Sequence, residues 1–103
     1  FVDITSANAA KIMGLYPKKG VLAPGSDADI VLIDPSIKRK LTKDDFHITD
    51  YSIWDGFDIE GWPTTTILRG KVVVENGQFS GSTSDGKFQT RKIDPEFTNR
   101  PAC

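Results

Sequence analysis

A chain of 103 residues forms at most one domain, and its 13 lysines and arginines against 14 aspartates and glutamates give a net charge of −1. This balance removes the electrostatic basis for binding nucleic acid or an anionic membrane, so we expect neither partner. The sequence holds no apolar stretch of roughly 18 residues and no charged-then-apolar leader, and we expect neither a transmembrane helix nor a signal peptide. The single cysteine, Cys103, cannot close an internal disulfide, which fits a reducing compartment and a cytoplasmic protein.

The first residues predict helical structure. Phe1 and Ile4 are spaced as in the last turn of a helix that starts upstream, so we expect a fragment of a longer protein. A new short helix should follow, capped by Thr5 or Ser6 and ended by Gly14. Its apolar face would hold Ala9, Ile12 and Met13.

The stretch 20–34 has the densest turn chemistry and the longest apolar run. Residues 21–23 predict a short strand, and Pro24 with Gly25 predicts a turn. Residues 30–33 are apolar on both faces, which is typical of a buried strand that needs cover on both sides. Pro35 cannot donate to a sheet, so we expect the strand to stop there.

Residues 37–41 alternate apolar and basic side chains, which predicts an edge strand whose lysines and arginine form a solvated face rather than a docking site. Residues 42–62 predict a long loop. Its acidic residues argue against base stacking, and its aromatic residues favour packing on a neighbouring domain or subunit over a ligand pocket. These aromatic residues are Phe46, Tyr51, Trp54, Phe57 and Trp62.

Two strands joined by a two-residue turn are predicted next. Residues 64–68 and 71–75 are separated by Arg69-Gly70, and Asn76-Gly77 marks a second turn. Val72, Val73 and Val74 should form a buried strand. After Phe79 the composition becomes polar, which predicts an extended tail that is mobile unless it lies across another surface.

The residues offer little catalytic chemistry. His47 has no second histidine or partner cysteine for a zinc site, and Cys103 has no base, so each is interpreted as non-catalytic. The acids at 44–58 could form a carboxylate pair, but nothing fixes their separation. We therefore assign no catalytic, cofactor-binding or metal-ligating residue, and the residues alone describe a non-catalytic β unit with a helical lead-in and a tail.

Three blocks of sequence resemble the closing segment of the amidohydrolase superfamily: SANAAKI at 6–12, GLYPKKG at 14–20 and GSDADIV at 25–31. The loop at 50–56, ILRG at 67–70, the segment 72–77 and DGKF at 85–88 followed by Arg91-Lys92 are most similar to the dihydropyrimidinase and hydantoinase group. The resemblance extends from Phe1 to about Lys92.

The resemblance implies a parent enzyme with a (β/α)8 barrel of about 250 residues, which is not in this chain, and a composite β-sandwich. It also implies two zinc ions, bridged by a carboxylated lysine of the barrel, that activate water to open a cyclic amide. We therefore expect a mainly β segment with three parts: 1–19 as a helical exit from the barrel, 20–79 as part of the sandwich, and 80–103 as a tail that contacts another subunit of a homotetramer.

By this resemblance the chain binds no zinc, is inactive alone and has the rest of its own protein as its partner. A non-catalytic scaffold homologue of the collapsin-response mediator type would have the same closing segment. Histidine pairs of the His-x-His type upstream would distinguish the enzyme from the scaffold. A self-standing β module used for binding is a third alternative, which predicts cooperative unfolding of the chain alone.

Overall fold

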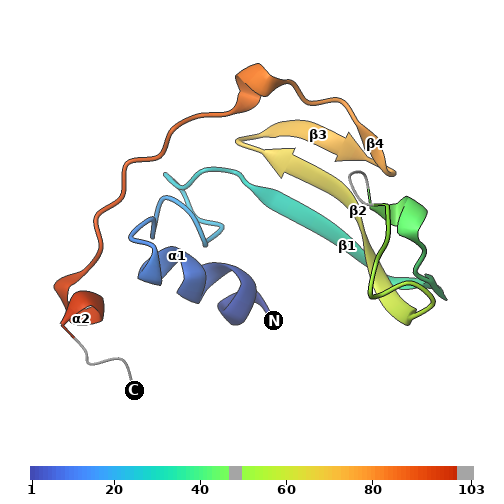
Figure 1. Ribbon diagram of the computed structural model, residues 1–103. Helices are drawn as coiled ribbons and strands as arrows, with labels where there is room; N and C mark the ends of the chain where they lie inside the picture. Colours follow the sequence, from blue (N-terminus) through green and yellow to red (C-terminus); the bar gives the residue numbers. More distant parts are fainter. Residues whose placement is uncertain (47–49, 100–103) are drawn as a thin grey trace.

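The computed structural model describes residues 1–46 and 50–99, so His47 and Cys103 lie outside the described residues. It contains a four-stranded antiparallel sheet of order β1-β2-β3-β4, a helical segment at the N-terminus and an extended tail (Figure 1). The strands are β1 (Ile30–Lys40), β2 (Asp58–Leu68), β3 (Lys71–Glu75) and β4 (Gln78–Phe79). The predicted mainly β fold with a short N-terminal helix and an extended tail is therefore confirmed.

The N-terminal helical segment is one continuous unit rather than two helices. The π-helix η1 (Asp3–Ala7) leads directly into α1 (Asn8–Ile12), and Thr5 donates its hydroxyl to the Phe1 carbonyl at 2.9 Å instead of capping a new helix. The predicted cap at Thr5 or Ser6 is wrong, because a helix already surrounds both positions. The predicted end is confirmed, since Gly14 takes a left-handed φ of 69°.

The predicted apolar face of this helix is not buried within the described residues. Ile12 is 55 % exposed and Met13 48 %, whereas Ala10 is 6 % exposed. Ala10 is buried because the returning chain passes close to it: a Cβ on Gly20 would lie 2.5 Å from the Ala10 Cβ. A small residue at each position allows this close approach.

Residues 21–23 form an irregular loop, so the predicted short strand is wrong. The strand that follows is longer than expected, because β1 continues through Pro35. The register between β1 and β2 shifts between Asp34 and Lys38, which accommodates the proline within an irregularity of an edge strand. Asp34 accepts hydrogen bonds from the Ser36 amide at 2.8 Å and the Ser36 hydroxyl at 2.6 Å, and so shapes the backbone at this point.

The apolar run of β1 is not buried in this chain. Val31 is 53 % exposed, Leu32 50 % and Ile33 48 %, and β1 lies at an edge of the sheet. The burial expected for this strand therefore stays a prediction, because its cover must come from outside the described residues. The cover that such a strand needs is not supplied by them.

The two predicted glycine turns are both confirmed. Arg69 and Gly70 have φ values of 47° and 83°, and Asn76 and Gly77 have values of 48° and 78°. Positive φ at both central residues is the pattern of a type I′ hairpin turn, which matches the twist of the flanking strands. Of the three valines in β3, Val73 is buried, whereas Val72 is 42 % exposed, so the predicted burial of this strand is only partly correct.

The predicted loop at 42–62 is shorter than expected. A 3-10 turn, η2 (Lys43–Asp45), begins it, and β2 already starts at Asp58, opposite Lys40 of β1. We call residues 50–57 the aromatic loop. Its last residues are tied to the end of β1, since Leu41 donates its amide to the Phe57 carbonyl and Gly56 donates to the Leu41 carbonyl, each at 2.8 Å.

The tail contains a 3-10 turn, η3 (Thr83–Asp85), and one short helix, α2 (Pro95–Thr98). It leaves β4, passes the turn between β2 and β3, and arcs back towards the N-terminal helical segment (Figure 1). The helices of residues 1–46 and 50–99 all lack the length and hydrophobicity of a transmembrane span.

Candidate functional site

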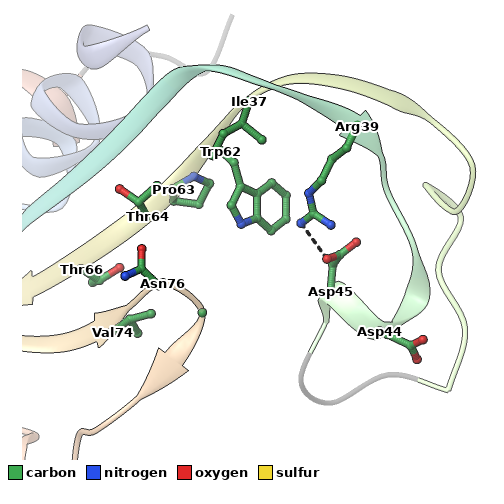
Figure 2. A pocket seen from close by; sticks show the side chains of 11 residues that line it. Ile37, Arg39, Asp44, Asp45, Trp62, Pro63, Thr64, Thr66, Val74 and Asn76 are labelled. Atoms are coloured by element: carbon green, nitrogen blue, oxygen red, sulfur yellow. Dashed lines mark ion pairs between the residues drawn. The ribbon is translucent and has the colours of Figure 1, made fainter.

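A groove of about 660 Å³ lies on one face of the sheet (Figure 2). Side chains two residues apart in a strand point to the same face, which brings Ile37 and Arg39 of β1 together with Trp62, Thr64 and Thr66 of β2. Pro63 of β2, Val74 of β3, the turn at Asn76 and Gly77, and the acids of η2 complete the lining. The groove therefore combines one indole, one guanidinium, two hydroxyls, one amide and two carboxylates.

Arg39 is the central side chain of this groove. Its guanidinium carbon lies 4.3 Å from the centroid of the Trp62 ring, and its Nη2 lies 2.7 Å from Asp45 Oδ1. A guanidinium over an indole is a favourable cation–π arrangement, and the carboxylate fixes its orientation. The Arg39 side chain is 37 % exposed, so part of it remains accessible from the groove.

Asp45 is held in place by the cap of its own turn. Its Oδ2 accepts the Thr42 amide at 2.8 Å and the Thr42 hydroxyl at 3.0 Å, which is a reciprocal capping box. The Thr42 amide, together with the Arg39 guanidinium, lowers the pKa of the Asp45 carboxyl below its ordinary value. Asp45 is therefore a charged group at neutral pH with both oxygens engaged.

Chemically, this arrangement offers groups that can bind a partner: an indole, a guanidinium, hydroxyls, an amide and carboxylates. Of the two acids that line the groove, Asp45 is already paired with Arg39, and the Thr64 hydroxyl donates to the Leu32 carbonyl rather than to a base. Asp58, at the other end of this segment, pairs instead with Lys40 at 3.0 Å. The carboxylate pair considered for 44–58 is thus not formed by Asp45 and Asp58, which are paired separately with cations.

The sequence prediction missed Arg39 as a site residue. The basic residues of 37–41 were assigned together to a solvated face, which is correct for Lys38 and Lys40, each 66 % exposed in ion pairs with Glu60 and Asp58. Arg39 lies on the opposite face, towards Trp62. The alternation of side chains along a strand could have identified Arg39, because it places Arg39 on the same face as the apolar residues Ile37 and Leu41.

A second cluster, which we call the polar corner, joins the loop after α1 to the sheet. It consists of Lys19, Asp27, Asp29 and Arg69: Lys19 contacts both carboxylates, Asp27 at 2.8 Å, and Asp29 Oδ1 accepts the Arg69 amide at 2.8 Å. The hydrogen bond from Lys19 lowers the pKa of Asp27. Burial opposes the charge on Lys19, but its hydrogen bonds to Asp27 and Asp29 outweigh that effect and raise its pKa.

A zinc site does not fit the residues that the structure describes. Over 1–46 and 50–99, no group of three or more histidine, cysteine, aspartate or glutamate side chains is arranged to hold a metal ion. The two residues considered for metal or nucleophilic chemistry, His47 and Cys103, lie outside these ranges.

The sequence model of the Amidohydrolase family matches residues 1–73, which is more than half of the chain. The chain belongs to the amidohydrolase family. Among its family relatives, the D-hydantoinases of Rhizobium radiobacter and Ralstonia pickettii are each 43 % identical to it over 93 residues, which is 89 % of this chain and 20 % of theirs.

Solved structures of this group share the fold described above. A D-hydantoinase structure superimposes with a TM-score of 0.85 at 42 % identity, and the dihydropyrimidinase of Brevibacillus agri with 0.85 at 41 %, each over 89 % of this chain and 20 % of that chain. The L-hydantoinase of Arthrobacter aurescens gives a TM-score of 0.82 at 38 % identity. The chain thus spans about a fifth of the length of the relatives it matches, and the predicted resemblance to this group is confirmed.

Proposed function

We propose that this chain is the closing, structural segment of a cyclic amidohydrolase that hydrolyses the ring amide of dihydropyrimidines or hydantoins. The observation that carries the proposal is the 43 % identity to D-hydantoinases over 89 % of the chain. The segment supplies part of a β-sandwich, residues 1–19 lead out of the barrel, and the catalytic groups belong to the rest of the protein.

The exposed apolar surface supports a partner within the same protein. Val31, Leu32 and Ile33 lie about half exposed on an edge strand, next to an apolar groove of about 550 Å³ between β1 and the N-terminal helical segment. A sheet edge and an apolar face of this kind require cover to remain soluble. The N-terminal strands of the sandwich are the proposed cover.

The proposal assigns zinc to the barrel, because the described residues of this chain do not fit a metal site. When bound there, the metal would supply the activated water for amide hydrolysis. The proposal further includes a homotetramer in which residues 80–103 contact another subunit. It also includes a cytoplasmic location, which fits the single cysteine of the chain.

The test compares the intact protein with the 103-residue chain. The intact protein should open dihydrouracil or hydantoin and contain zinc by elemental analysis, whereas the chain alone should do neither. Turnover by the chain alone would overturn its structural assignment. An intact protein that lacks both turnover and zinc would overturn the enzyme assignment in favour of a scaffold homologue.

A further inference from the structure

The tail between β4 and α2 is irregular for most of its length. Ser80 still bonds to Val73 of β3, and beyond Ser80 the tail is fixed to the rest of the chain at two further points. One lies at the turn between β2 and β3, and the other at the end of the N-terminal helical segment. In Figure 1 the tail spans these two points as an arc along the outside of the molecule.

At the sheet, the attachment is centred on Asp85. Lys71 donates to both carboxylate oxygens of Asp85, at 2.8 and 2.9 Å, and Arg69 donates its guanidinium to the Asp85 carbonyl. The same carboxylate accepts the Ser82 amide at 2.7 Å, which closes the capping box of η3. Two cations of the β2–β3 hairpin thus hold one residue of the tail.

At the helix, the attachment is centred on Gly14. The Lys92 amide donates to the Gly14 carbonyl at 3.0 Å. A Cβ built on Gly14 would lie 2.5 Å from both the carbonyl carbon and the carbonyl oxygen of Lys92, and 2.7 Å from the Ile93 nitrogen. These are backbone atoms, which cannot move aside as a flexible side chain can, so the tail lies this close only because Gly14 has no side chain.

Arg69 connects this arc to the polar corner, because its amide also donates to Asp29. The helical segment packs mainly within itself and the strands pack on each other, so these loops and the tail determine how the two parts are joined. The polar corner lies in the loop that joins the two parts, and the tail joins them a second time from the outside.

We propose that residues 80–93 are a strap, latched at Gly14 and anchored at Asp85, that holds the N-terminal helical segment against the sheet of the same chain. Release of the strap at Gly14 frees Arg91 and Lys92 and leaves the helical segment joined to the sheet only through residues 13–29, which include the polar corner. This role does not depend on the enzymatic activity proposed above.

The test is a matched pair of substitutions, Gly14→Asn and Gly25→Asn. Both glycines have left-handed φ values, 69° and 90°, which asparagine tolerates, but a Cβ on Gly25 meets no atom within 4 Å. Hydrogen exchange of the Lys92 amide should accelerate by roughly tenfold or more in Gly14→Asn and remain unchanged in Gly25→Asn. Trypsin cleavage after Arg91 should likewise be faster in Gly14→Asn and unchanged in Gly25→Asn. Equal exchange in the two variants would overturn the strap.

If Gly14→Asn also speeds hydrogen exchange in the sheet, its effect on Lys92 could come from general unfolding. A second variant then tests the strap separately. Asp85→Ala removes the side-chain acceptor at the other end of the strap without adding atoms at Gly14. Faster exchange across 80–93, with β2 and β3 still protected, supports the strap. Unchanged exchange across 80–93 overturns it.

Discussion

The polar corner and the aromatic loop lie at opposite ends of the sheet and differ in how they are completed. At one end, Ile30 of β1 pairs with Ile67 of β2, and at the other Lys40 pairs with Asp58. The charged side chains of the polar corner all have partners in the same chain: Lys19 contacts Asp27 and Asp29, and the Arg69 guanidinium contacts the Asp85 carbonyl. In the aromatic loop, Tyr51 and Ile53 are each 73 % exposed.

This difference shows that the chain satisfies its polar groups locally and leaves much of its apolar surface uncovered. Hydrogen bonds and ion pairs need only a few nearby atoms, which turns and loops can provide. Burial of large apolar side chains needs an extensive packed surface, and the core within the described residues is limited to Ala10, Leu41 and Val73. Substitutions at the two ends should therefore have different effects.

The largest effect is expected from Asp29→Ala in the polar corner. The change removes the acceptor of the Arg69 amide and one of the two carboxylates at Lys19. Hydrogen bonds to a charged group that is partly exposed contribute about 1–2 kcal/mol, and urea denaturation should show a loss of that order. Asp55→Ala in the aromatic loop is the control and should change stability by less than about 0.5 kcal/mol. Equal losses would contradict the difference between the two ends.

A smaller effect on stability, but a larger one on association, is expected when Tyr51 and Ile53 are both changed to serine. Neither side chain is buried in this chain, so the free energy of unfolding should change by less than about 0.5 kcal/mol. Exposed apolar side chains promote association, so dye binding and self-association in sedimentation should both fall. A loss of stability well above that limit would mean that the aromatic loop packs on its own sheet.

Local chemistry explains which elements could be predicted from the sequence. Arg69-Gly70 and Asn76-Gly77 gave the correct turns because glycine takes a positive φ without steric cost, which is a property of the residue itself. Gly14 ended the helix for the same reason. The tail was expected to need another surface, and at Lys92 that surface is Gly14 of the same chain.

The errors arise where the structure depends on a distant partner. Pro35 was expected to end a strand, but its place at a sheet edge and the register shift against β2 are set by pairing with residues 58–67. The groove at Arg39 was missed for a similar reason, because the turn at Asp45 must fold back onto the sheet before the ion pair exists. Only the position of Arg39 on the Ile37 face could have been inferred from the spacing.

The smallest effect is expected from pH, and it should come from the polar corner and the other paired acids rather than from the aromatic loop. The hydrogen bond from Lys19 lowers the pKa of Asp27 below 3.8, and the hydrogen bond from Lys71 lowers that of Asp85 in the same direction. A lowered folded pKa contributes stability that is present above 3.8 and lost as the pH falls through the folded value.

Lys19 acts in the opposite direction, because its pKa is raised above 10.5 and its contribution is lost only as the pH rises through that folded value. The urea midpoint should therefore be flat near neutral pH and fall below about pH 4. Asp27→Asn should reduce this acid-dependent fall, because an amide does not titrate. A fall of the same size in the variant and in the unsubstituted chain would show that Asp27 does not contribute to the acid sensitivity.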